Sequence, residues 1–189
     1  MSRRIAVALV HYPVVDGQGA IVTTAVTNLD VHDLARSART YGCSDYFVVH
    51  PIEAQRELVR RIRDHWTVGS SAKRIPDRRE ALTRLRIVSS LDDVWEALGG
   101  GRASIEVWAT AARDLGPCLA FDQARERLSR EEDPRAVVLL FGTGWGLARG
   151  VISLADAVLE PIRATSEGYN HLSVRAACAI ALDRLLGAR

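Results

Sequence analysis

Three glycines alternate with other residues at the end of an apolar run, VVLLFGTGWGL. Gly142, Gly144 and Gly146 lie where a buried strand is expected to end, so they indicate a turn whose backbone approaches a ligand closely. The pattern lacks the third glycine and the later acidic residue of a dinucleotide fingerprint, and it lacks the Gly-Lys-Ser/Thr of a P-loop. A tight turn without a ligand is the alternative interpretation.

Other residues that could do chemistry are scattered. Three cysteines, Cys43, Cys118 and Cys178, are too far apart to predict a metal-ligand pair, and no Gly-x-Ser-x-Gly motif occurs. Among the histidines, His32 and His171 stand in the segments of greatest interest, although each histidine is individually typical of packing or of a surface position. The sequence therefore favours neither metal nor hydrolase chemistry, and we expect no metal.

Arginine dominates the basic residues. Of 25 lysines and arginines only Lys73 is a lysine, while the net charge is only +2. The guanidinium group suits phosphate contacts because its donors form a planar fork. Arginines gather over residues 52–66 and in the polar segment 67–79, which predicts a basic helix followed by a mobile basic loop that contacts a phosphate backbone. Acidic neighbours leave an ordinary solvated face as the alternative.

These residues need elements that position them, and strands alternate with helices along the chain. We expect one domain over 1–189, of the α/β class with a largely parallel sheet. Strands are predicted at 4–12, 45–50, 85–90, 104–113, 135–142 and 157–162. Helices are predicted at 30–42, 52–66, 90–100, 120–132 and 172–187, with Asp30 and Ser90 as N-caps.

Three unusual loops follow strands in the second half of the chain: ATAARDLG, FGTGWGL and PIRATSEGYNHLS. In parallel sheets ligands bind outside the carboxyl ends of the strands. The three loops together therefore predict one ligand site at that edge. No apolar run approaches the roughly 20 residues of a bilayer span, and we expect a cytoplasmic protein without membrane contact.

The order of these segments resembles the SPOUT class of S-adenosylmethionine-dependent RNA methyltransferases. The likeness is strongest to a bacterial RNA methyltransferase family whose domains sometimes occur joined to the tRNA guanine-N1 methyltransferase. It rests on VHYPVVDGQGAIVTTAVTNLDVHDLARSARTYG, FGTGWGL and YNHLSVRAACAIALDRLLG, which span nearly the whole chain. The resemblance implies a deep C-terminal trefoil knot that holds S-adenosyl-L-methionine, an RNA substrate (tRNA or rRNA) and a homodimer.

The resemblance also implies residue roles. It places Arg36 in substrate activation or phosphate binding, with Asn28 and Asp30 as supporting groups. The implied cofactor-binding residues come from the three strand-end loops: Thr110, Ala111, Ala112, Phe141, Gly142, Thr143, Gly144, Gly146, Leu147, Pro161, Ile162, Tyr169, Asn170, His171, Leu172 and Ser173.

The chain departs from the common SPOUT pattern at the second motif, where Thr143 and Gly144 replace the usual asparagine and glutamate. Base and ribose methylation therefore both stay open. Trp145 either packs beneath the knot or contacts a substrate base. A non-catalytic RNA-binding protein with a degenerate site is the alternative function, and a nucleotide-binding regulator of another α/β type is a weaker one.

Overall fold

The computed structural model describes residues 3–68, 71–130, 133–165 and 168–188. A six-stranded sheet with the order β5-β4-β1-β7-β6-β8 forms the centre, and all of its strand pairs are parallel. Its strands are β1 (Ile5–Val10), β4 (Asp45–Val49), β5 (Leu85–Val88), β6 (Ile105–Ala109), β7 (Ala136–Gly142) and β8 (Ala157–Val158). The predicted α/β class with a parallel sheet is confirmed, and all strand carboxyl ends meet at one edge. A separate antiparallel hairpin joins β2 (Val14–Val15) to β3 (Ile21–Val22).

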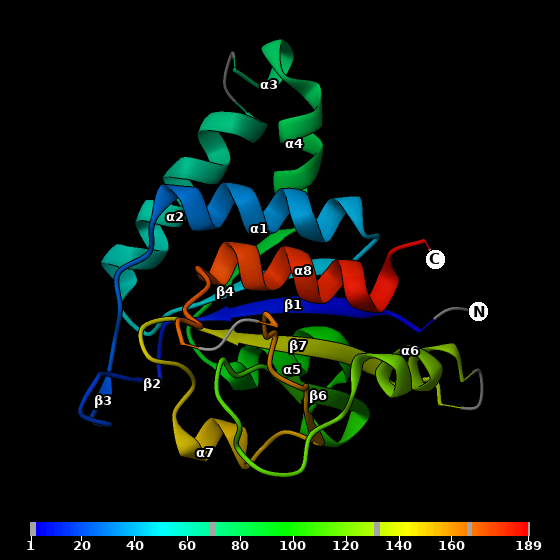
Figure 1. Cartoon of the computed structure of the whole chain (residues 1–189). Helices are drawn as coiled ribbons and strands as arrows, with labels where there is room; N and C mark the ends of the chain where they lie inside the picture. Colours follow the sequence, from blue (N-terminus) through cyan, green and yellow to red (C-terminus); the bar gives the residue numbers. More distant parts are fainter. Residues whose placement is uncertain (1–2, 69–70, 131–132, 166–167, 189) are drawn as a thin grey trace.

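Helices cover both faces of the sheet (Figure 1). The helices are α1 (Asn28–Thr40), α2 (Glu53–Thr67), α3 (Ser71–Arg74), α4 (Pro76–Thr83), α5 (Leu91–Gly99), α6 (Phe121–Ser129), α7 (Arg149–Ile152) and α8 (Val174–Leu186). One face packs against α1, α6 and α8, while α5 and α7 pack against the other. Within the described residues, no helix has the length and apolar composition of a membrane span.

Alternation along β1 shows why this layering forms. Successive side chains of a strand point to opposite faces. Val7 and Leu9 accordingly join the apolar cluster beneath α1 and α8, whereas Ala6 and Ala8 join the cluster beneath α5. All six residues of β1 are buried, because helices cover both of its faces.

The start of α1 differs from the prediction by three residues. Thr27, not Asp30, is the N-cap: its Oγ1 accepts a hydrogen bond from the Asp30 backbone N–H at 3.2 Å. The Asp30 carboxylate in turn accepts from the Thr27 hydroxyl at 2.6 Å. Thr27 and Asp30 therefore cap the helix by bonding to each other. Asp30 lies in the first turn, where its negative charge interacts favourably with the helix dipole. The cap predicted at Ser90 is confirmed, with a capping box completed by Asp93.

The segment 67–79 is not the loop that was expected. It contains α3 and the first residues of α4, and residues 69–70 lie outside the described residues. Pro76 stands in the first turn of α4, where its missing N–H costs no hydrogen bond. Ala81 and Leu82 are buried, so α4 is held by core packing that the polar local sequence did not reveal.

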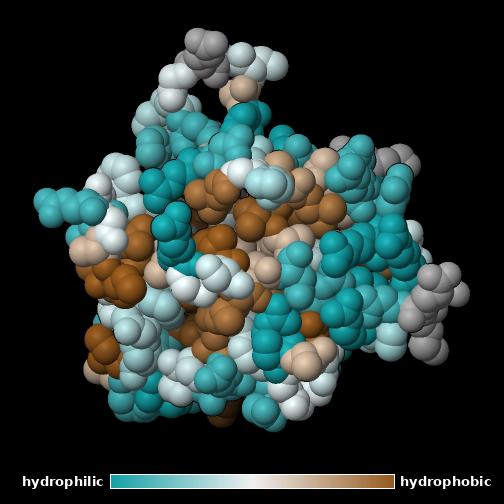
Figure 2. Space-filling model, turned by 90° about the horizontal axis from the view of Figure 1, so that it is seen from below, coloured by the Kyte–Doolittle hydropathy of each residue, from teal (hydrophilic) through white to brown (hydrophobic). Residues whose placement is uncertain are grey.

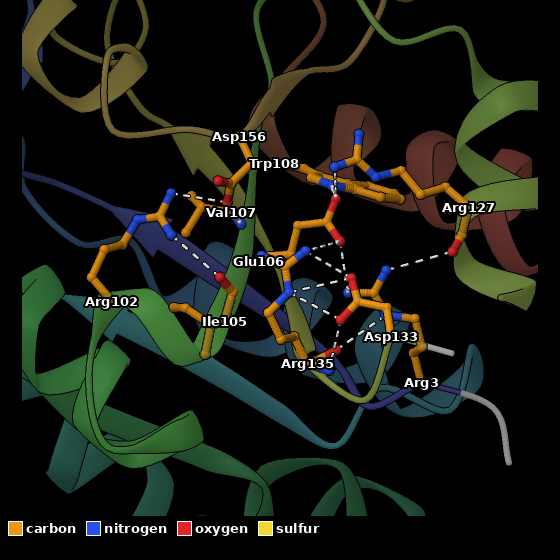
Figure 3. Close-up of polar contacts among 10 residues, drawn as sticks. All are labelled: Arg3, Arg102, Ile105, Glu106, Val107, Trp108, Arg127, Asp133, Arg135 and Asp156. Carbon is orange, nitrogen blue, oxygen red and sulfur yellow. Dashed lines mark hydrogen bonds and ion pairs between the residues drawn. The ribbon is translucent and has the colours of Figure 1, made fainter. Parts of the chain in front are cut away.

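A buried ion cluster ties the amino-terminal edge of the sheet together (Figure 3). Glu106 on β6 is fully buried and pairs with Arg3 and with Arg127 of α6, each at 2.6 Å. The Trp108 indole N–H donates to the same carboxylate at 2.7 Å. Asp133 lies 3.4 Å from Arg3 and gives that buried guanidinium a second acidic partner. This cluster lies at the opposite ends of the strands from the predicted ligand site.

Candidate active site

A cavity of about 1000 Å³ lies at the carboxyl edge of the sheet. Its walls come from four segments: the chain between β2 and α1, the loop after β6, the loop after β7, and the chain from β8 into α8. β7 lies between β1 and β6 in the sheet, so the loops that follow neighbouring strands converge here. The three strand-end loops predicted to form one ligand site line this one cavity.

The glycine loop folds back on itself tightly. A Cβ at Gly142 would lie 2.6 Å from the backbone nitrogen of Leu147, so only glycine fits this return of the chain. Gly144 has a φ of +60° and packs so closely on the Val15 carbonyl that a Cβ would lie 3.0 Å from its oxygen. The Trp145 N–H donates to the Val15 oxygen, and the Val15 N–H donates to the Gly146 oxygen, both at 3.0 Å. The loop is therefore a preformed wall docked on β2.

The opposite wall joins the loop after β6 to the chain after β8. Thr110 donates through its hydroxyl to the Leu140 carbonyl at 2.8 Å, which fixes the beginning of its loop against β7. The Asn170 side-chain amide donates to the Ala112 carbonyl at 2.8 Å. The Glu160 carboxylate accepts from the Phe121 N–H at 2.9 Å. The bonds of Asn170 and Glu160 hold the chain after β6 and the chain after β8, which are far apart in sequence, around the cavity.

A partly buried chain of polar side chains connects the glycine loop to the end of β1. His11 Nδ1 lies 2.9 Å from the Thr24 hydroxyl, which lies 2.5 Å from the Thr143 hydroxyl. Burial, together with the neighbouring His50, lowers the pKa of His11 to about 4, so its imidazole is neutral at pH 7. The His11 Nε2 is buried without a hydrogen-bond partner among the described residues. Thr24 and Thr143 line the cavity, and this chain fixes their side chains.

Asp30 lies in the cavity wall beside α8. Its Oδ1 accepts from Arg175 at 2.9 Å, and its other oxygen accepts from Thr27. The carboxylate therefore joins the start of α1 to the start of α8 and orients both around the cavity.

The structure brings together most of the residues predicted to bind a cofactor. Those lining the cavity are Thr110, Ala111, Ala112, Phe141, Gly142, Thr143, Gly144, Gly146, Leu147, Ile162, Asn170, His171, Leu172 and Ser173. Pro161 faces a smaller polar hollow next to it, and Tyr169 is exposed outside the lining set. Of the three residues predicted to act on the substrate, only Asp30 lines the cavity. Asn28 and Arg36 are exposed on α1 and do not.

The other residues of interest lie elsewhere. His32 is on α1 and contacts Trp66 edge-on, with ring centroids 5.5 Å apart. The arginines of α2 are partly neutralised, because Arg56 and Arg60 both pair with Glu53. This pairing favours the ordinary solvated face for α2. Trp145 is 60% exposed, and this exposure favours contact with a substrate base over packing beneath the knot.

Sequence reasoning missed one wall of the cavity, the chain between β2 and α1. It supplies Val15, Gly19, Thr24, Ala25 and Thr27. This segment follows β1 at the same edge of the sheet, so its place after a buried strand was the available signal. Arg113 and Arg149 were also missed; both line the cavity with exposed side chains.

The surface around the site mixes apolar and charged groups. Seen from below Figure 1, on the side where α7 lies, apolar side chains gather near the centre of the face with hydrophilic ones around them (Figure 2). Among the residues that the structure describes, no cluster of three or more His, Cys, Asp or Glu side chains could hold a metal ion.

Known sequences match this chain over nearly its whole length. A family model described as "SAM-dependent RNA methyltransferase" matches residues 4–187. A tRNA (guanine-N(1)-)-methyltransferase from Nitratidesulfovibrio vulgaris is 44% identical over 187 residues, which cover 98% of this chain. This chain spans only 43% of that relative's length. An uncharacterized protein from Aquifex aeolicus is 36% identical over 187 residues and is covered over 89% of its own length.

Solved structures share the fold. TrmJ from Z. mobilis superimposes with a TM-score of 0.61 at 18% identity, covering 95% of this chain and 67% of that one. A SpoU methyltransferase, AviRb, from Streptomyces viridochromogenes in complex with AdoMet superimposes with a TM-score of 0.54 at 16% identity, covering 98% and 58%. At these identities the likeness concerns the arrangement of the sheet and helices.

Proposed function

Because the chain belongs to the family of SAM-dependent RNA methyltransferases, we propose that its cavity binds S-adenosylmethionine beside a nucleotide of RNA. One observation carries this proposal: a single cavity of about 1000 Å³, walled by the glycine loop and both neighbouring strand-end loops. Small-molecule sites typically measure about 300–1000 Å³, so the cavity has room for a cofactor and an acceptor nucleotide. The bound cofactor supplies a methyl group on a sulfonium, an electrophile for an RNA oxygen or nitrogen.

The residues present fit such a cofactor. Gly142 lets the chain after β7 fold closely onto Leu147 and so shapes the wall, and the side chains of Thr110 and Ile162 line the same cavity. Pocket walls of this kind combine apolar contacts with a few polar groups that fix orientation. We assign the cofactor to the fourteen lining residues named above and leave Pro161 and Tyr169 out of direct contact.

The roles of Asp30, Arg36 and Asn28 toward the RNA follow from the bonds and the exposure that each side chain has in the structure. The Asp30 carboxylate holds Arg175 and Thr27, so we assign it a positioning role between α1 and α8. Arg36 points from an exposed position of α1 outside the cavity, which supports RNA phosphate binding as its role. Asn28 is exposed near the start of the same helix and supports the same contact.

The Arg36 assignment has a direct test. Arg36→Ala is expected to abolish methyl transfer to RNA while calorimetry shows nearly unchanged affinity for S-adenosylmethionine. Arg130→Ala, at an exposed arginine that forms the C-cap of α6 and lies outside the basic segments 52–66 and 67–79, is the matched control and should retain transfer. Loss of cofactor binding in Arg36→Ala contradicts the assignment.

We further propose that the chain between β8 and α8 forms the trefoil knot of the SPOUT class and that two copies form a homodimer in the cytoplasm. The bonds of Glu160 and Asn170 to the loop that follows β6 support the knot, because they hold the C-terminal chain against that loop. The partly exposed apolar residues of α8 support the dimer. Sedimentation equilibrium tests the dimer, and a single sedimenting species at the monomer mass rejects it.

The central experiment joins cofactor binding to product mapping. Calorimetric titration with S-adenosylmethionine is expected to show saturable binding. The absence of heat at millimolar cofactor rejects the proposal that the chain is a methyltransferase. Mass mapping of modified nucleosides in tRNA and rRNA from a deletion strain then identifies the nucleotide. The chain covers 43% of the tRNA (guanine-N(1)-)-methyltransferases, so their named target is not carried over. RNA binding without cofactor binding identifies a non-catalytic RNA-binding protein instead.

A further inference from the structure

An exposed aromatic cluster stands at the mouth of the cavity. Trp145 and Tyr169 are 60% and 84% exposed, and the His171 ring lies between them. The ring centroids of Trp145 and His171 are 6.0 Å apart, and those of Tyr169 and His171 are 5.2 Å apart. Large aromatic side chains gathered on a surface mark a binding site more often than single exposed apolar residues do. We call Trp145, Tyr169 and His171 the aromatic platform.

The indole of Trp145 is held in place although it is exposed. Its backbone N–H is bonded to the Val15 carbonyl, and glycines with positive φ flank it on both sides. The indole lies on Gly17 so closely that a Cβ there would come within 3.2 Å of the ring. The side chain is therefore fixed over the hairpin while much of its surface stays open. A preordered aromatic surface loses little conformational entropy when a ligand stacks on it.

Positive charge lines the same cavity as Trp145 and His171. Arg113 and Arg149 line the same cavity and are exposed, and neither forms an ion pair with a carboxylate among the described residues. The neighbouring Arg163 does pair, with Asp114 at 3.2 Å. Unneutralised arginines next to stacking surfaces are the combination by which proteins hold single-stranded nucleic acid.

We propose that the aromatic platform stacks an unpaired nucleotide of the RNA substrate and presents it to the cavity, while Arg113 and Arg149 hold the flanking phosphates. This inference rests on the proposed function. An atom of a base inside a duplex lies out of reach of a cavity of this kind, so the nucleotide must be unpaired or turned out of its helix. The substrate class is therefore a single-stranded or loop segment of RNA, recognised by stacking.

The test compares three variants with the wild-type protein: Trp145→Ala, Trp145→Phe and Leu154→Ala. Leu154 is 46% exposed but does not line the cavity, so it is the matched control for loss of an exposed apolar side chain. The probes are a single-stranded 12-mer oligoribonucleotide containing all four bases and the same strand annealed to its complement. Methyl transfer to bulk tRNA and rRNA from a deletion strain supplies a second measurement.

Trp145→Ala is expected to bind the single-stranded 12-mer about 5- to 150-fold more weakly, because a base stacked on an aromatic side chain contributes affinity in this range. Trp145→Phe should recover most of the loss, and Leu154→Ala should match the wild type. The duplex should bind the wild-type protein more weakly than the single strand. In transfer assays, Trp145→Ala should raise the KM for RNA while the affinity for S-adenosylmethionine stays within twofold.

Two results contradict the proposal that the aromatic platform stacks a nucleotide of the RNA. Unchanged RNA affinity and unchanged KM in Trp145→Ala show that the indole does not contact the substrate. A loss of cofactor affinity in the same variant shows that Trp145 serves S-adenosylmethionine instead. Failure of the wild-type protein to bind S-adenosylmethionine is a different outcome, because it rejects the proposed function from which the platform follows.

Discussion

Replacing Gly142 with alanine places a methyl group where the chain after β7 returns on itself. The new Cβ lies 2.6 Å from the Leu147 backbone nitrogen and 3.0 Å from the Gly146 carbonyl carbon. Leu147 must retreat by about 0.8 Å to reach ordinary contact, and because this neighbour is backbone, the whole loop moves with it. Overpacking of this kind costs about 1–3 kcal/mol. If that strain displaces the cofactor wall, affinity for S-adenosylmethionine falls roughly 5- to 150-fold.

Calorimetry with S-adenosylmethionine measures the effect, and thermal unfolding of the same samples shows how much of the strain lowers stability. Gly150→Ala is the control, because its added Cβ meets nothing within 4 Å and its position is within α7. Alanine is the better helix former there, so the control should keep its affinity and its stability. A folded Gly142→Ala protein that binds S-adenosylmethionine within twofold of wild type refutes the assignment of the glycine loop as a cofactor wall.

Two further predictions concern buried ionisable side chains. Among the described residues, Glu106→Gln leaves the buried guanidinium of Arg3 with Asp133 as its acidic partner, so we expect the free energy of unfolding to fall by about 3 kcal/mol. Urea unfolding measures this loss, and an unchanged midpoint contradicts it. His11 has a pKa of about 4 in the folded protein, because burial disfavours its charged form, against about 6.5 for an exposed histidine. The unfolded chain therefore takes up its proton first as the pH falls, and stability should decline between pH 6.5 and 4 by about 3 kcal/mol. In His11→Gln this part of the stability–pH curve should flatten, and an equally steep curve in the variant shows that other groups cause the decline.

Local sequence was sufficient for the six strands of the parallel sheet and for α1, α2, α5, α6 and α8, but it missed the β2–β3 hairpin and the short helices α3, α4 and α7. The continuous apolar run of β1 and the capping box at Ser90 depend on residues a few positions apart, so patterning predicts them. Because these patterns reach only a few residues along the chain, they also explain where the predictions from sequence were wrong. Thr27 and Asp30 are both good caps, and only the observed bonds decide between them. The segment 67–79 appears polar, yet Leu82 inserts into a core formed by distant residues, and this holds α4 in place.

By itself the sequence determined that a glycine-rich turn ends a buried strand and that two further unusual loops follow strands in the second half of the chain. The tertiary structure decided which loops meet. Placement of β7 between β1 and β6 brings Thr24, Thr110 and Thr143 around one cavity, and it leaves Arg36 outside. It also decided that the Trp145 indole rests on Gly17 while 60% of the residue stays exposed. Strand order and side-chain exposure depend on contacts between residues far apart in the chain, which local patterns of residue type do not encode.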